Sequence, residues 1–206
     1  LKLGVLDPIL DALAGAGVVV EIFAEVAPDP TTAIVMDGVA RLRACGADAV
    51  LAVGGGSSMD AAKAIVACHA NGSTPGRLEG YFKVRRQGPA FYAAPTTAGT
   101  GSEVTIASVV SDPVARRKFA IVDGKLAPAA IALDPALMVG LPPAVTGATG
   151  MDALTHAIES YLSTLATPKT RAMSKAAARA ILRDLVPAYD DGRDMRRRES
   201  LAVAVL

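Results

Sequence analysis

The sequence contains no tryptophan, and aromatic residues make up only 4% of its 206 residues. With 51% hydrophobic residues, its core must be built mainly from Ala, Val, Leu and Ile, which lets helices lie close on a sheet. No apolar run approaches the ~18–20 residues that a membrane-spanning helix needs, so we expect no membrane partner. No signal-peptide pattern is present, and we predict a cytoplasmic location. The chain starts at Leu1 rather than Met, so we expect the natural N-terminus to lie further upstream.

Cysteine and net charge are also scarce. Two cysteines, Cys45 and Cys68, cannot form a disulfide framework and are expected to pack as small hydrophobes. A formal net charge of +1 gives no general reason to expect nucleic acid as a partner. The densest basic cluster, Arg193 with residues 196–198, is interleaved with acidic residues, which favours a solvated helix face over a phosphate site.

Helix and strand patterns alternate over the first 140 residues. Thr31 or Thr32 is expected to cap a helix that buries Val35, Val39 and Leu42 and ends at Gly46. A second helix is predicted over residues 58–70. Strands are predicted at residues 18–24, 49–53, 91–94, 118–122 and 130–133. This order indicates an α/β domain with a mostly parallel, Rossmann-like sheet.

The pattern changes after Pro142-Pro143. Helices are predicted over residues 152–163, 169–186 and 196–206, with no strand signal between them. We therefore predict an α/β dinucleotide-binding domain over residues 1–143 and the beginning of an all-helical domain over residues 144–206. The last predicted helix stops without a cap, so we expect the helical domain to be truncated.

Two glycine-rich segments each follow a predicted strand. Gly54-Gly55-Gly56-Ser57 opens a helix, where free N–H groups and the helix dipole favour an anion, although a plain strand-to-helix turn gives the same pattern. Asp60 would favour the first turn of that helix. The second segment, residues 95–102, combines threonine hydroxyls with two glycines and is either a ligand-binding loop or an ordinary turn.

One helix carries a carboxylate and an imidazole on the same face. Asp152 and His156 stand four residues apart, so both can reach one divalent cation. Taken alone, such a pair is more often structural, either an ordinary i,i+4 charge contact or an aspartate near a helix start that favours the dipole. Because a stable site needs three or four ligands, the pair amounts to half of a metal site.

Three blocks in this order, residues 53–65, 95–105 and 150–162, resemble the iron-containing (group III) alcohol dehydrogenase family. Residues 131–135 and 141–143 also match. The resemblance as a whole runs from about Ala27 to the end of the chain. It implies a dehydroquinate synthase-like architecture. It also implies a metal-dependent enzyme that transfers a hydride between a primary or secondary alcohol, or its aldehyde or ketone, and NAD or NADP.

The resemblance assigns roles to individual residues. The glycine-rich loop would hold the cofactor pyrophosphate, the threonine loop would line the nicotinamide–ribose cleft, Lys118 would lie near the ribose and Val109 would pack on the nicotinamide. Asp152 and His156 would be two of four ligands to Fe²⁺ or Zn²⁺. The expected cofactor contacts are Gly55, Gly56, Ser57, Thr96, Thr97, Thr100, Val109 and Lys118.

The sequence departs from the family pattern in two respects. The family's two later histidine ligands have no counterpart, because the only other histidine, His69, ends the helix after the glycine-rich loop and is a poor ligand candidate. The family's first strand is also expected to be missing. Two alternatives therefore stand beside the alcohol dehydrogenase: an inactive fragment that binds nucleotide only, and a metal-independent, maleylacetate-reductase-like enzyme. The implied partners are a small alcohol or aldehyde and further copies of the chain, in a homodimer or larger assembly.

Overall fold

The computed structural model describes residue 4 and residues 6–206. Its internal contacts divide the chain into two compact units. The α/β unit comprises Leu1–Ala94 and Ser102–Ala132, and the helical unit comprises Pro95–Gly101 and Leu133–Leu206. None of the described helices is both long and apolar enough to cross a membrane.

The α/β unit contains four helices and six strands within its described part. Its helices are α1 (Asp7–Gly15), α2 (Thr32–Cys45), α3 (Gly56–Asn71) and α4 (Pro75–Leu78), with 3-10 turns η1 (Ser102–Val104) and η2 (Gly124–Leu126). Its strands are β1 (Ala49–Gly54), β2 (Gly80–Tyr81), β3 (Ala90–Pro95), β4 (Ala107–Asp112), β5 (Arg117–Val122) and β6 (Ala130–Ile131). The predicted strands at residues 49–53, 91–94, 118–122 and 130–133 are confirmed to within two residues.

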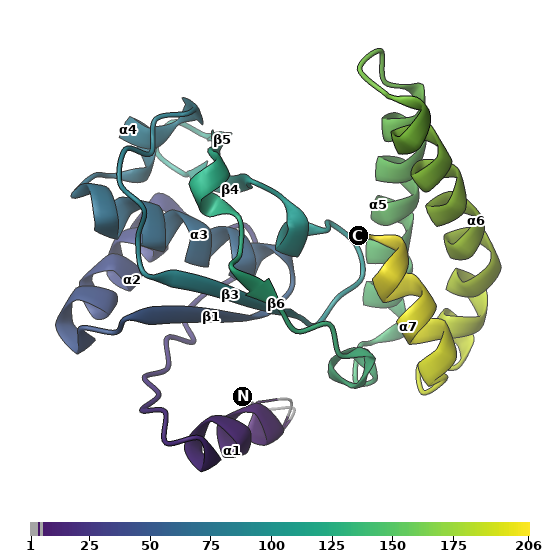
Figure 1. Ribbon diagram of the computed structural model, residues 1–206, viewed down its shortest axis with the longest axis horizontal. Coiled ribbons are helices and arrows are strands. Elements are labelled where there is room, and N and C mark those ends of the chain that lie inside the picture. Colours follow the sequence, from purple (N-terminus) through teal and green to yellow (C-terminus); the bar gives the residue numbers. More distant parts are fainter. Residues whose placement is uncertain (1–3, 5) are drawn as a thin grey trace. The chain divides into compact units, whose positions relative to one another are not determined.

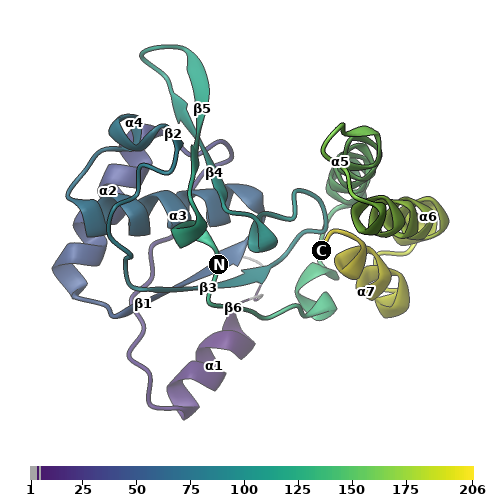
Figure 2. The ribbon, with the colours of Figure 1, turned by 45° about the horizontal axis from the view of Figure 1, so that its top comes forward.

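The strands form two small sheets, in the orders β1-β3-β6 and β2-β5-β4. β3 pairs in parallel with β6, and β2 pairs in parallel with β5, whereas β4 and β5 form an antiparallel hairpin. Helix α3 packs on both β1 and β4 and so lies between the two sheets (Figures 1 and 2). The predicted α/β class is correct, and the hairpin is an antiparallel addition to it.

Sequence patterns missed β4 and the two-residue strand β2, and they predicted one strand that does not form. In β4 the fully buried positions are Ser108 and Val110, so a polar side chain breaks the expected apolar alternation. The predicted strand at residues 18–24 is wrong. Its Val19 side chain is 98% exposed, and the segment pairs with no other part of the described chain. β-branched residues favour a strand only where a neighbouring strand supplies hydrogen bonds and packing.

The helix predicted from its cap and buried stripe is confirmed as α2. The Thr31 Oγ1 atom accepts a hydrogen bond from the Ile34 N–H at 3.3 Å, and Gly46 ends the helix with φ 64°. The buried face carries Val35, Val39 and Leu42 as predicted. Gly38 shares this face, and a Cβ there would lie 2.3 Å from Ile65 Cδ1, so glycine lets α2 approach α3.

The helical unit consists of α5 (Pro143–Leu162), α6 (Pro168–Asp190) and α7 (Met195–Ala204), with a 3-10 turn η3 (Pro135–Met138). Helix α5 begins nine residues before its predicted start at Asp152. The glycines in this extra stretch have a packing role, because a Cβ on Gly150 would lie 2.2 Å from Leu185 Cδ1 of α6. Ala153, Ile181, Leu185, Ala188 and Leu201 form the buried core of this unit.

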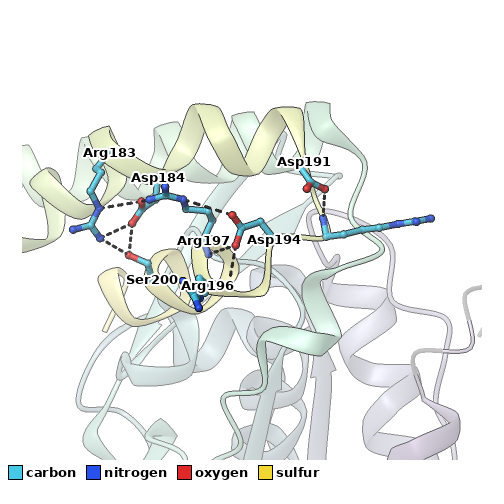
Figure 3. A network of polar contacts seen from close by, with 8 residues as sticks. Arg183, Asp184, Asp191, Asp194, Arg196, Arg197 and Ser200 are labelled. Atoms are coloured by element: carbon cyan, nitrogen blue, oxygen red, sulfur yellow. Dashed lines mark hydrogen bonds and ion pairs between the residues drawn. The ribbon is translucent and has the colours of Figure 1, made fainter.

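A buried carboxylate ties α6 to α7 (Figure 3). Asp184 is fully buried, and its carboxylate accepts hydrogen bonds from Arg183 Nη2 at 2.6 Å, from Arg197 and from the Ser200 hydroxyl. Asp194 starts α7 by accepting hydrogen bonds from the backbone N–H groups of Arg196 and Arg197. The hydrogen bonds from Arg183, together with those from Ser200 and Arg197, hold the pKa of Asp184 well below its usual range.

We expect Asp184→Asn to lower the free energy of unfolding by about 2–3 kcal/mol, because an amide places N–H donors against the arginine donors. Urea unfolding of the variant and of Asp190→Asn, an exposed change on the same helix, measures this; the control should stay within about 0.5 kcal/mol. A depressed carboxyl pKa stabilises the fold above the unfolded-state value and loses that contribution as the pH falls below it. The gap between wild type and Asp184→Asn should therefore close below about pH 4, and a gap that is constant down to pH 2 would contradict this account.

Candidate functional site

The glycine-rich loop joins β1 to α3. Gly54 has φ 153°, and a Cβ there would lie 2.4 Å from the Ser58 Oγ atom, so only glycine fits without strain. Gly55 caps α3, and its carbonyl accepts hydrogen bonds from the N–H groups of Ser58 at 3.0 Å and Met59 at 3.2 Å. The N–H groups of Gly56 and Ser57 precede the first intrahelical bond and, with the helix dipole, can bind an anion.

Two of the residues predicted to contact the cofactor are joined through Asp29. Its backbone N–H donates to the Ser57 Oγ atom at 3.2 Å, and its carboxylate accepts a hydrogen bond from Lys118 Nζ at 2.6 Å. The Asp29 and Lys118 side chains are 65% and 56% exposed, so both are accessible to a ligand. The α/β unit thus places a lysine ammonium group beside the N-terminal end of α3.

Sequence patterns alone did not identify Asp29 as part of this cluster. Asp29 stands between two prolines and adopts φ 57°, a left-handed conformation that aspartate tolerates better than most residues. Asp29 is 28 residues from Ser57 and 89 residues from Lys118 in the sequence, so no local motif contains these contacts.

The remaining predicted cofactor residues are divided between the two units. Val109 lies on β4 in the α/β unit, with its side chain 41% exposed. Thr96 and Thr97 are half-buried and Thr100 is exposed, in the segment Pro95–Gly101 that belongs to the helical unit. In that segment Gly99 packs closely on α5, since a Cβ on it would lie 2.8 Å from Thr149 Cβ.

Asp60 does not lie in the first turn of α3, so the role expected from the helix dipole is wrong. Its carboxylate instead accepts hydrogen bonds from the Ser102 hydroxyl at 2.6 Å and from the Val109 backbone N–H. Burial raises the pKa of this carboxyl group, and the hydrogen bonds only partly offset that effect.

The Asp152 and His156 pair lies on α5 as the spacing predicts. His156 Nε2 is 3.7 Å from Asp152 Oδ1, and the side chains are 51% and 43% exposed. Within residue 4 and residues 6–206, no three His, Cys, Asp or Glu side chains come together in a group that could hold a metal ion. A carboxylate and an imidazole suit Fe²⁺ or Zn²⁺, but two donors alone do not make a site.

A cavity of about 860 Å³ lies in the helical unit, and His156 and the threonine-rich segment both contribute to its wall. Gly99 of that segment and His156 both line it, together with polar groups from α6 and α7 that include Thr170, Arg196 and Glu199. Most of the remaining lining is alanine and other small or apolar side chains. The cavity is therefore apolar with a few polar groups at its wall, as small-molecule sites usually are.

The family model for iron-containing alcohol dehydrogenase matches residues 1–135, and the model for the C-terminal part of this family matches residues 146–206. The chain is 40% identical over 188 residues to alcohol dehydrogenase 4 of Saccharomyces cerevisiae (strain YJM789), covering 91% of this chain and 49% of the relative. It is 39% identical over 201 residues to the NAD-dependent methanol dehydrogenase of Bacillus methanolicus, covering 98% and 53%.

A solved structure agrees with these relatives. The crystal structure of a 1,3-propanediol oxidoreductase matches with a TM-score of 0.95 at 40% identity, covering 98% of this chain and 53% of that one. The chain spans about half the length of the relatives it matches. With both family models matched in order, the chain belongs to the iron-containing alcohol dehydrogenase family, and the prediction drawn from its three motif blocks is confirmed.

The geometry of the glycine-rich loop predicts the effect of a single methyl group. Gly54→Ala forces a side chain into a left-handed backbone conformation and against Ser58, which should cost about 2 kcal/mol of folding stability. The matched control is Gly76→Ala, where a Cβ meets nothing within 4 Å; it should change stability by less than about 0.5 kcal/mol. Chemical unfolding of both variants tests this, and equal stabilities would refute the requirement for glycine at position 54.

Proposed function

We propose that this chain supplies the nicotinamide-cofactor site and two metal ligands of an alcohol dehydrogenase. The reaction is the transfer of a hydride from the carbinol carbon of a primary or secondary alcohol to the oxidised nicotinamide, with release of the hydroxyl proton. The observation that carries this proposal is the joining of Ser57, Asp29 and Lys118 at the N-terminal end of α3. NAD is favoured over NADP because a relative 39% identical to this chain is an NAD-dependent dehydrogenase.

Each end of the cofactor meets a different part of the proposed site. The N–H groups of Gly56 and Ser57 bind the pyrophosphate at the helix N-terminus. Lys118, held by Asp29, donates to the ribose, and Val109 packs on the nicotinamide ring. Thr96, Thr97 and Thr100 supply hydroxyl groups to the nicotinamide–ribose part of the cofactor. Hydride transfer itself is the chemistry of the nicotinamide, so these residues serve to bind and orient it.

In the helical unit, we propose the cavity as the site for the alcohol. Asp152 and His156 are the proposed ligands to iron, and they would supply two of the three or four donors that a stable site uses. When bound, a divalent metal ion supplies Lewis acidity toward the alcohol oxygen. The apolar lining of the cavity excludes water from the reacting carbon and favours a small alcohol or aldehyde.

A second candidate is a unit that binds nucleotide without turnover, but the homologues, which are alcohol dehydrogenases, favour the dehydrogenase. This candidate and the dehydrogenase share the cofactor site and differ in metal content. Binding and metal measurements therefore separate them.

We expect Lys118→Met to raise the dissociation constant for NAD⁺ about tenfold, because it removes a charged hydrogen bond and leaves the Asp29 carboxylate unpaired beside the anion site. Calorimetric titration measures this. Lys125→Met is the matched control, because Lys125 pairs with Asp123 two residues away in its own turn. Equal affinities of wild type, Lys118→Met and Lys125→Met would exclude Lys118 from the cofactor site.

Metal content and turnover test the alcohol end. The purified protein should carry about one Fe or Zn per chain and reduce NAD⁺ when a primary alcohol is added. His156→Ala should lose the metal and at least about 100-fold in rate, whereas His69→Ala should retain both. A wild-type protein that binds NAD⁺ but holds no metal and oxidises no alcohol would favour the nucleotide-binding unit instead.

A further inference from the structure

A lysine side chain is buried inside the α/β unit. Lys63 of α3 is 1% exposed, and its ammonium group donates to the carbonyls of Ser102, Thr105 and Ala107 at 2.6, 2.8 and 2.9 Å. The Thr105 hydroxyl lies at 3.0 Å from Nζ. These partners are peptide carbonyls and a hydroxyl group from one short segment, η1 and the start of β4, so the ammonium fixes the path of that backbone.

Burying this ammonium group opposes its charge. Desolvation lowers the pKa of Lys63 to about 8, with Asp60 and Glu103 acting in the opposite direction. A methionine would fill the same space without this penalty. The lysine therefore contributes directed hydrogen bonds to specific carbonyls rather than packing alone.

Asp60 holds the same segment from one turn earlier on α3. Its carboxylate binds the Ser102 hydroxyl and the Val109 N–H, and its backbone carbonyl accepts a hydrogen bond from the Ser108 hydroxyl at 2.7 Å. Asp60 and Lys63 are three residues apart and so share a helix face. Together they bind the segment from Ser102 to Val109 to the helix that begins at the glycine-rich loop.

We propose that Lys63 and Asp60 are positioning residues, which hold β4 so that Val109 meets the nicotinamide while the pyrophosphate occupies the loop at the start of α3. This inference rests on the proposed cofactor site. Neither residue touches the cofactor. The tie acts on the nicotinamide half only, because the N–H groups of Gly56 and Ser57 belong to α3 itself and stay in place without it.

The test compares two ligands. NAD⁺ would contact both the pyrophosphate loop and Val109, whereas ADP lacks the nicotinamide and would contact only the loop. Dissociation constants for NAD⁺ and for ADP are measured by calorimetry on the wild type and on Lys63→Met, which keeps the methylene volume. We expect the NAD⁺ constant to rise about tenfold and the ADP constant to change less than twofold. Lys175→Met makes the same chemical change at an exposed position of α6 and should alter neither.

A milder variant covers the case in which Lys63→Met does not fold. Thr105→Val removes one of the four acceptors of the Lys63 ammonium with nearly the same side-chain shape, and should raise the NAD⁺ constant two- to threefold with ADP unchanged. Equal weakening of both ligands, or of neither, in the folded variants would overturn the positioning role while leaving the cofactor site intact. A wild type that binds neither ligand would instead overturn the proposed function, and the inference with it.

Discussion

The α/β unit depends on the helix α3 and on two of its charged side chains, the buried Lys63 and the half-buried Asp60. One face of α3 packs its apolar residues with α2, and another presents Asp60 and Lys63 to β4. An apolar contact holds two elements together but permits small rotations and shifts, whereas hydrogen bonds to named carbonyls allow one arrangement. The helix therefore sets both the direction of the free N–H groups at its start and the position of the hairpin strand beside it.

In the helical unit, a buried side chain of the opposite charge holds two helices together. Asp184 is buried in α6, and the arginine side chains that bind it remain 65% and 37% exposed. Hydrogen bonds from these charged donors stabilise the ionised carboxylate, so the pKa of Asp184 falls. Lys63 instead meets uncharged carbonyls inside the unit, and desolvation outweighs the attraction of nearby carboxylates. A buried charged side chain joins two elements in both units. Its charged form is favoured where the partners are oppositely charged, as for Asp184, and disfavoured where they are neutral carbonyls, as for Lys63.

Local sequence patterns predicted the helices and turns that are specified by a few neighbouring residues. The cap at Thr31, the stripe on α2 and the glycine-rich turn before α3 are each encoded within a few residues. β4 was not predicted because a polar residue, Ser108, faces the core. Its hydroxyl donates a hydrogen bond to the Asp60 carbonyl, which lies 48 residues away in the sequence. At residues 18–24 a strand was predicted that does not form. Their β-branched side chains favour a strand, but no described strand pairs with them.

The same distinction separates the proposed cofactor site of the α/β unit from the proposed metal ligands of the helical unit. The anion site that we propose at the start of α3 uses consecutive backbone N–H groups, so four adjacent residues suggest it, although a plain strand-to-helix turn gives the same pattern. Its side-chain partners Asp29 and Lys118 come from distant segments, and only the folded chain brings them to Ser57. A metal site has no such local core, because three or four donors must converge from separate elements. The i,i+4 spacing of Asp152 and His156 therefore predicts at most one helix's share of a ligand set, and the number of donors around that helix decides whether the pair binds a metal or forms a surface contact.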